Sequence, residues 1–198
     1  GTIAPNPEGD SLAAAVVRAA GGDRWLKNPS ITISFSFVIR RDGKELSRYR
    51  HFWERRYNRV TVEGTMRDGR SWRAVVNDHA SREGLASVDG TAAPDSLRDQ
   101  ILDAGYGRFV NDSYWLMMPL KLLDDGVHRA RLNDSIFNGN PVEVLFIWFD
   151  NVGLTPGDRY RIFVDPKSHQ VVGWRYMLQS NRTGEYIWDN VTTVGPIT

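Results

Sequence analysis

Short strands joined by tight turns are the feature that most constrains the fold of this chain of 198 residues. In residues 31–39, ITISFSFVI, large apolar side chains alternate with mostly small polar ones. This period of two places the apolar set on one face of a strand. Asp42–Gly43 follows directly and is typical of a hairpin turn. No helix-sized connection separates successive strands of this kind, so the pattern predicts antiparallel pairing.

The turn residues divide the chain into two runs of strands. Asp68–Gly69 and Asn138–Gly139 repeat the hairpin pattern, and Pro156–Gly157–Asp158, Asp165–Pro166 and Thr183–Gly184 mark further turns. The sequence therefore predicts about five strands before the middle of the chain and about five after it. The predicted strands lie within residues 31–39, 46–56, 59–66, 71–78, 84–90, 127–134, 141–150, 158–165, 169–178 and 185–194.

A helix is expected near the start of the chain. Residues 12–20, LAAAVVRAA, follow the cap candidates Asp10 and Ser11 and end at Gly21–Gly22. The apolar residues fall on one face at helical spacing, so this helix should lie on a sheet.

The middle of the chain predicts two more helices. Pro94 begins a helical pattern over residues 94–109. Residues 111–113, Asn-Asp-Ser, are cap candidates for a second and shorter helix that ends before Pro119. Gly105, Gly107 and Gly126 lie nearby and are candidate hinges.

The inward strand faces carry more large apolar side chains than a flat sheet with short helices requires. Residues 142–149, VEVLFIWF, are apolar on both faces, so this strand is expected to be covered on both sides. We predict an α+β fold: one domain over residues 1–198, built as an unclosed antiparallel β half-barrel of about 10–11 strands. The N-terminal helix and a mid-chain helical lid, residues 94–123, complete it.

The lid would cover a concave face lined with aromatic and aliphatic side chains. The adjacent Met117 and Met118, beside Trp115, form an adaptable apolar surface of the kind used where ligands vary. The alternative is that this segment is ordinary core. The residues predicted to line the cavity and its lid are Phe35, Phe37, Trp53, Trp72, Ile101, Tyr114, Trp115, Met117, Met118, Leu120, Phe146, Trp148 and Trp174.

Composition excludes several classes of function. The formal net charge is +1, so bulk electrostatics favour neither a nucleic acid nor an anionic membrane as partner. The chain has no cysteine, which excludes disulfides, thiolate zinc sites and cysteine nucleophiles. No apolar run is long enough to span a membrane. The chain begins without Met, so we expect a mature form whose targeting segment has been removed.

Known catalytic and nucleotide-binding motifs are absent from the sequence, so no catalytic residue and no cofactor is predicted. The four histidines, at positions 51, 79, 128 and 169, are scattered, and no metal site is predicted from them. Asp124–Asp125 is expected to be the turn that ends the lid. Strand alternation places Arg48, Arg50 and Phe52 on one face, which should be solvated.

Three segments resemble the LolA/LolB-like family of periplasmic lipoprotein carriers. They are HFWERRYNRVTVEG (51–64), MRDGRSWRAV (66–75) and VDPKSHQVVGWRY (164–176). The resemblance implies an open β half-barrel with a helical lid inserted midway, and it gives Arg56, with Arg55 beside it, the role of holding the lid closed. Tyr57 stands where the family usually has a proline.

The expected function is non-catalytic binding or carriage of an acyl chain, a lipoprotein or another large hydrophobic ligand in the bacterial cell envelope. The expected partners are that ligand and an envelope protein, with no nucleic acid and no stable membrane insertion, and the chain is expected to be a periplasmic or envelope-associated monomer. Two alternatives stay open: an envelope structural or assembly protein whose core is filled, and an enzyme acting on an apolar substrate in the same cavity.

Overall fold

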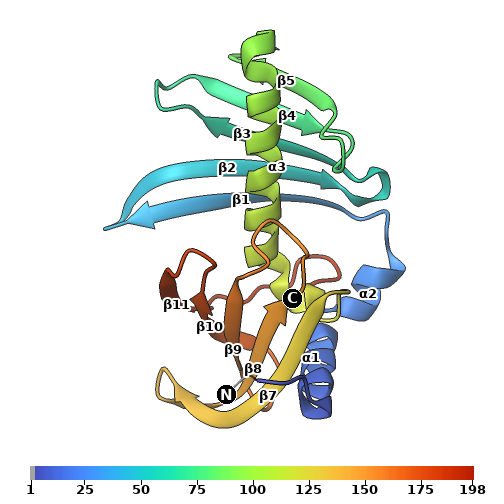
Figure 1. Cartoon of the computed structure of the whole chain (residues 1–198), viewed down its shortest axis with the longest axis vertical. Coiled ribbons are helices and arrows are strands. Elements are labelled where there is room, and N and C mark those ends of the chain that lie inside the picture. The colour runs from blue at the N-terminus through green and yellow to red at the C-terminus, as the bar shows by residue number, and fades with distance from the viewer. Residues whose placement is uncertain (1–2) are drawn as a thin grey trace. The chain divides into compact units, whose positions relative to one another are not determined.

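The computed structural model describes residues 3–198, and its contacts divide the chain into two compact units. One unit comprises residues 28–116, and the other comprises the chain up to residue 27 together with residues 117–198. Figure 1 gives the elements of both. Within residues 3–198 no helix has the length and apolarity needed to cross a bilayer.

The 28–116 unit is an antiparallel sheet with a long helix on it. The strands hydrogen-bond in sequence order, so each pairs with the next along the chain. They are β1 (Thr32–Arg41), β2 (Lys44–Glu54), β3 (Arg59–Thr65), β4 (Ser71–Val76), β5 (Gly84–Val88) and β6 (Thr91–Ala92). A 3-10 turn, η1 (Arg55–Tyr57), connects β2 to β3.

The hairpin turns predicted from sequence are present. Asp42 and Gly43 both have positive φ, at 51° and 74°, and Asn138 and Gly139 repeat this pair at 47° and 79°. Positive φ at both central residues defines the turn whose twist matches that of paired strands, and Asn, Asp and Gly adopt it at least cost.

The helix of this unit, α3 (Asp95–Met117), corrects the prediction of two mid-chain helices. It is continuous for 23 residues and passes through Asn111, Asp112 and Ser113, which do not cap a new helix. Asp112 is instead fully buried within it. Polar residues followed by an apolar run are read as a cap, but a helix continues through them when a tertiary contact satisfies their side chains. The helix ends at a 3-10 turn, η2 (Met118–Lys121), which contains Pro119.

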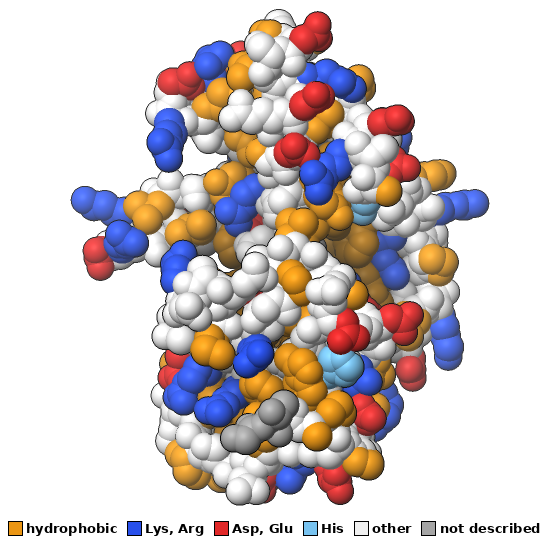
Figure 2. Space-filling view, in the orientation of Figure 1, with side chains coloured by type: hydrophobic (Ala, Val, Ile, Leu, Met, Phe, Trp, Pro, Cys, Tyr) orange, Lys and Arg blue, Asp and Glu red, His pale blue; other side chains and the backbone are white. Residues whose placement is uncertain are grey.

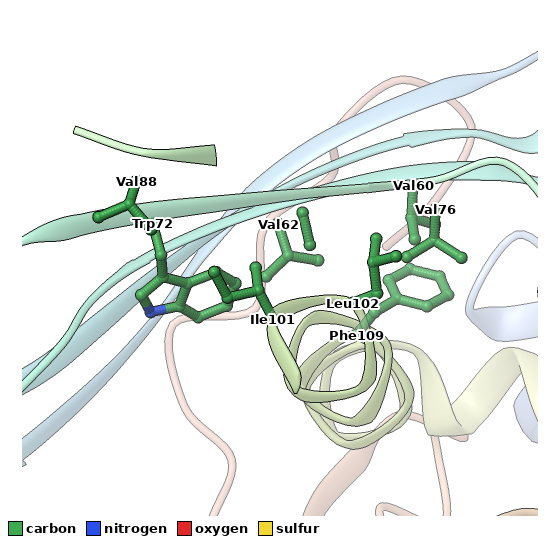
Figure 3. Close-up of a cluster of buried hydrophobic side chains, with 9 residues drawn as sticks. Val60, Val62, Trp72, Val76, Val88, Ile101, Leu102 and Phe109 are labelled. Atoms are coloured by element: carbon green, nitrogen blue, oxygen red, sulfur yellow. The ribbon is translucent and has the colours of Figure 1, made fainter. Parts of the chain in front are cut away.

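The first half of α3 packs tightly on the sheet. In Figure 3, which looks along the helix, Ile101 lies beside Trp72 while Leu102 and Phe109 point toward Val60 and Val76. A Cβ added at Gly105 would lie 2.5 Å from the Cβ of Ala74. Gly105 therefore allows helix and sheet to approach closely and is not the hinge that the sequence suggested.

The other unit contains the second antiparallel sheet and the N-terminal helices. The sheet order is β11-β10-β9-β8-β7. Its strands are β7 (Val127–Phe137), β8 (Asn140–Phe149), β9 (Arg159–Val164), β10 (Val171–Met177) and β11 (Thr183–Ile187). The helices are α1 (Pro7–Ala19) and α2 (Gly22–Lys27).

Helix α1 begins earlier than the cap candidates Asp10 and Ser11 predicted. Asn6 is the N-cap: its Oδ1 accepts hydrogen bonds from the backbone N–H of Gly9, at 2.7 Å, and of Arg131 on β7, at 2.9 Å. Its Nδ2 also donates to the carbonyl oxygen of Arg131. One side chain thus starts the helix and attaches it to the sheet, and Pro7 occupies the first helical turn, where proline is tolerated.

The predicted fold class is confirmed: the protein is α+β, the eleven strands within residues 3–198 are antiparallel, its sheets are unclosed, and it has an N-terminal and a mid-chain helix. The hydrogen-bonded strands form two sheets, and the first has six strands, not five, because the short β6 adds to its edge. Strand β8 has buried side chains on both faces, as its sequence predicts. The extent of the single domain, residues 1–198, stays a prediction.

Candidate functional site

The candidate site lies on the inner face of the 28–116 unit, where β1 and β2 meet the second half of α3. The register pairs Ile33 with Trp53, Phe35 with His51 and Phe37 with Tyr49. Directly opposed residues share a face, so these side chains form three rows across the two strands. All but the fully buried His51 are half-buried.

A buried hydrogen bond connects this face to α3. His51 is 2% exposed and Asp112 is 0% exposed, and His51 Nε2 lies 2.9 Å from Asp112 Oδ2. The ring of Phe35 stacks on that of His51 at 4.5 Å between centroids, nearly parallel. Since a buried carboxylate is costly without partners, this contact fixes where the helix lies on the strands.

Two further donors from α3 complete the shell of Asp112. Arg108 Nη2 donates to Asp112 Oδ1 from one turn earlier in the helix. Asn111 Nδ2 donates to the same oxygen at 2.9 Å. The guanidinium of Arg108 lies over the ring of Tyr49, at 4.4 Å from its centroid, and 5.8 Å from that of Phe37. We call His51, Arg108, Asn111 and Asp112 the polar clasp.

The polar clasp keeps Asp112 ionised. Burial by itself raises the pKa of Asp112, but hydrogen bonds from His51, Arg108 and Asn111 outweigh it and hold the pKa below its ordinary value. Both carboxylate oxygens are already engaged by donors, so Asp112 acts as a counter-ion within the fold.

Aromatic contacts surround the polar clasp. Phe109 meets Trp53 edge to face at 5.1 Å, and Trp115 meets Phe37 edge to face at 6.3 Å. On the other flank of α3, His79 lies 5.4 Å from Tyr106, and burial lowers the pKa of His79 although Asp78 opposes this. The second half of α3 is thus attached by these rings and the polar clasp as well as by the core contact of Phe109, whereas the first half rests on the hydrophobic core.

An open groove of about 520 Å³ runs along one flank of α3. It is lined by Tyr49 and Trp72 from the sheet and by Ala104, Gly107, Arg108 and Asn111 from the helix. Gly107 and Arg108 lie three and four residues after Ala104, and Asn111 lies four and three residues after them, so the four positions share one face. Ala104 and Gly107 leave the space open because they carry almost no side chain.

The structure brings together those predicted site residues that belong to this unit. Phe35, Phe37, Trp53 and Trp72 share the inner sheet face. Ile101, Tyr114 and Trp115 lie on α3, where Ile101 is buried and the other two are half-buried.

The remaining predicted residues belong to the other unit and divide among three places. Met117 ends α3, while Met118 and Leu120 lie in η2; all three are buried. Trp174 is opposed to Ile162, and Ile162 to Leu145, so these three share one face of the second sheet. Phe146 and Trp148 point to the opposite face, and Trp148 stacks on His128 at 5.3 Å. The register therefore does not bring Phe146 and Trp148 together with Trp174.

The two arginines predicted to hold the lid lie in η1. Arg55 Nη1 donates to the carbonyl oxygen of Asn28 at 3.2 Å, and its guanidinium lies 5.8 Å from the Trp53 ring. Arg56 is exposed and lies 6.0 Å from the ring of Tyr57. Their role as a lock stays a prediction.

Sequence reasoning missed the polar clasp and Tyr49. His51 was interpreted as one of four scattered histidines, yet strand alternation places Tyr49 and His51 on the same face as Trp53. Arg108 and Asp112 are four residues apart, the spacing of a helical ion pair. Among residues 3–198 no group of three or more His, Asp or Glu side chains is placed to hold a metal.

Charged side chains elsewhere are dispersed. On the face shown in Figure 2, basic and acidic groups are interspersed with hydrophobic ones. Arg48, Arg50 and Phe52 are exposed together on the outer face of β2, as alternation predicts.

No protein-family model matches this chain, and no curated protein matches it. Nineteen chains of solved structures do match. A LolA superfamily protein from Nitrosomonas europaea, NE2245, is 12% identical, with 92% of this chain and 79% of that one covered and a TM-score of 0.46. A putative outer membrane lipoprotein-sorting protein domain from Vibrio parahaemolyticus is 11% identical, with coverage of 90% and 80% and a TM-score of 0.39.

MucB is 14% identical over 91% of this chain, with a TM-score of 0.36, and the chain spans only 56% of MucB. All three of these TM-scores lie below 0.5, so these similarities carry no argument about function. The solved structures to which the chain is similar thus include a member of the LolA superfamily, the family that its sequence resembles.

Proposed function

We propose that this chain is a non-catalytic binding or carrier protein of the bacterial cell envelope. Its ligand is an acyl chain, a lipoprotein or another large hydrophobic molecule, held on the inner face of β1 and β2 beneath α3. The observation that best supports this proposal is that the face remains half-buried beside an open groove. The half-buried side chains are Phe35, Phe37 and Trp53 on the strands and the facing Trp115 on α3. Each methylene transferred from water to such a surface contributes about 0.8 kcal/mol, so a long acyl chain would be held strongly.

The contrast between the two halves of α3 supports a lid. The first half is packed on the hydrophobic core with no spare room at Gly105. Beyond the core contact of Phe109, the second half is attached through the polar clasp and ring edges. Separating it from β1 and β2 would uncover aromatic surface for the ligand, and release would follow when an envelope protein partner offers a better surface.

The tight packing under the first half of α3 also favours a second candidate, an envelope structural or assembly protein. In that case Trp72, Ile101 and their neighbours simply fill the core. A protein with this function would need no ligand, and its α3 would not move.

Native mass spectrometry of the protein as purified from a bacterial envelope fraction tests the proposal, followed by organic extraction and lipid analysis. The expected result is a co-purified acyl species and uptake of a fluorescent fatty-acid probe. A clean apo mass with no probe uptake would replace the carrier by the filled-core candidate.

Adjacent positions on α3 provide a matched pair of variants. Trp115→Asp places a charge against Phe37 and should abolish the acyl adduct. Leu116→Asp places the same charge one residue further on, where the side chain is 48% exposed, and should retain the adduct. Equal loss in both variants would argue against binding at this face.

A further inference from the structure

The groove beside α3 is more polar than an acyl chain alone would require. Tyr49 and Trp72 supply flat apolar walls, but Arg108 and Asn111 lie on the helix side of the same space. Its volume of about 520 Å³ falls in the range of small-molecule sites, which combine apolar walls with a few polar groups that orient the ligand.

Arg108 enters this groove with unused hydrogen-bond donors. A guanidinium has five N–H groups. Among the residues that the structure describes, Arg108 donates one hydrogen bond, from Nη2 to Asp112, and its buried Nε has no acceptor. The side chain keeps 27% of its surface exposed, so it is reachable from solvent.

Arg108 is not the only group that binds the carboxylate of Asp112. His51 and Asn111 also donate to this carboxylate, which shares its two oxygens among three groups. The ring of Tyr49 holds the guanidinium plane at 4.4 Å and orients it. A planar, fixed guanidinium is the group best suited to a carboxylate or phosphate.

Small residues give a ligand access to this guanidinium. A Cβ built at Gly107 meets nothing within 4 Å, so the neighbouring helix surface is bare. Glycine in a helix interior is less stable than alanine, and Gly107 has no close packing partner that would account for its presence.

We propose that this groove binds the head-group end of an anionic amphiphile. Arg108 receives a carboxylate or phosphate, and the first methylenes of the chain lie against Tyr49 and Trp72. This inference rests on the proposed function and adds the class of head group to it. The carrier would then distinguish acidic amphiphiles from neutral esters of the same chain length.

Isothermal titration calorimetry with three ligands of one chain length tests this: dodecanoate, dodecyl phosphate and methyl dodecanoate, each below its micelle concentration. Dodecanoate or dodecyl phosphate, or both, should bind at least about tenfold more tightly than the ester, since a charge-assisted hydrogen bond is about twice as strong as a neutral one. Whichever acid binds more tightly identifies the source of the anionic group.

Two variants test whether the preference for acidic ligands arises at Arg108 in this groove. Arg108→Gln should bring the affinity ratio of acid to ester close to one, a readout that a general loss of structure would not produce. Gly107→Leu fills the groove without removing any interaction and should weaken all three ligands about tenfold or more. Asp99→Leu, an exposed position on α3 outside the groove lining, is the control and should bind as the parent does.

The outcomes separate this inference from the proposed function. The head-group site would be wrong if the parent bound all three ligands with an acid-to-ester affinity ratio near one, or if a higher ratio remained in Arg108→Gln. Either result would still be compatible with the carrier function. Unchanged binding in Gly107→Leu would likewise exclude the groove. No binding of any ligand by the parent protein would overturn both.

Discussion

Asp112 shows how much one helical residue contributes to the placement of an element. It lies in the interior of α3 without exposure, and three donors surround its carboxylate. Removing the charge would leave Arg108 and His51 with a neutral partner in a buried setting, and breaking such a pair is costly.

We therefore expect Asp112→Asn to lower the free energy of unfolding by roughly 2–4 kcal/mol, less than for a fully buried pair because Arg108 is partly exposed. Urea unfolding followed by circular dichroism measures this. Asp103→Asn is the control: Asp103, also on α3, pairs with Arg82 of the loop between β4 and β5, but it is 60% exposed, so we expect a change below about 0.5 kcal/mol. Equal effects at both positions would contradict the role given to the polar clasp.

Alanine substitutions at two glycines of α3, two residues apart, should change the stability of the protein in opposite directions. Gly105→Ala brings a Cβ to 2.5 Å from that of Ala74, so helix and sheet must separate. We expect a net loss of about 1–2 kcal/mol in unfolding free energy, because the strain of overpacking exceeds the gain in helix propensity. Gly107→Ala meets nothing and should gain up to about 1 kcal/mol. Thermal unfolding of both proteins checks this, and a gain at Gly105 would show that the contact with Ala74 is loose.

At the scale of elements, α1 is attached to its sheet through its N-cap residue. Asn6 caps the helix and makes two hydrogen bonds with the backbone of Arg131 on β7. An N-cap alone contributes about 0.5–2 kcal/mol.

Asn6→Ala should lower the unfolding free energy by about 2 kcal/mol, since it removes the cap and both strand contacts. Asn6→Asp keeps the acceptor for Gly9 and Arg131 but loses the Nδ2 donor, and should cost less than half as much. Chemical denaturation of the two variants ranks them, and an equal loss in both would mean that the Nδ2 hydrogen bond to the strand outweighs the cap.

The elements also show where sequence patterns succeed. Strand alternation placed Phe35 and Phe37 on one face of their strand, because the side-chain period of a strand is fixed by its backbone. The same rule, applied to β2, would have added Tyr49 and His51. The register between strands adds Trp53 and Trp72 to that face. Alternation could not show whether Phe146 and Trp174 share a face, since the register between strands decides which side chains of neighbouring strands lie on the same face.

For the molecule as a whole, the depressed pKa of Asp112 predicts how stability depends on pH. Its pKa is lower in the folded protein than the unfolded value near 4. The carboxylate therefore contributes stability above that unfolded value, and the contribution is lost as the pH falls through the lower, folded value.

We expect the difference in urea midpoint between the parent and Asp112→Asn to be constant from pH 7 to about pH 5 and to shrink below about pH 4. Other carboxylates with lowered pKa values, such as Glu54 and Asp165, titrate in both proteins and cancel in this difference. A difference that changes between pH 5 and 7 instead would contradict this role of Asp112.

The sequence by itself determined the elements whose signals are local. Period-two strands, Asn-Gly and Asp-Gly turns, an N-terminal helix and a helical middle follow from backbone sterics and the separation of apolar from polar side chains. These were enough to predict an α+β chain of antiparallel strands.

Only the tertiary structure decided that α3 is one continuous helix, that Asp112 lies inside it, and that the strands form two sheets. The physical reason is that a polar side chain has two ways to satisfy its hydrogen bonds, by capping a helix or by meeting a partner far away in sequence. At Asp112 that partner is His51, 61 residues earlier in the chain, and no local pattern records such a distance.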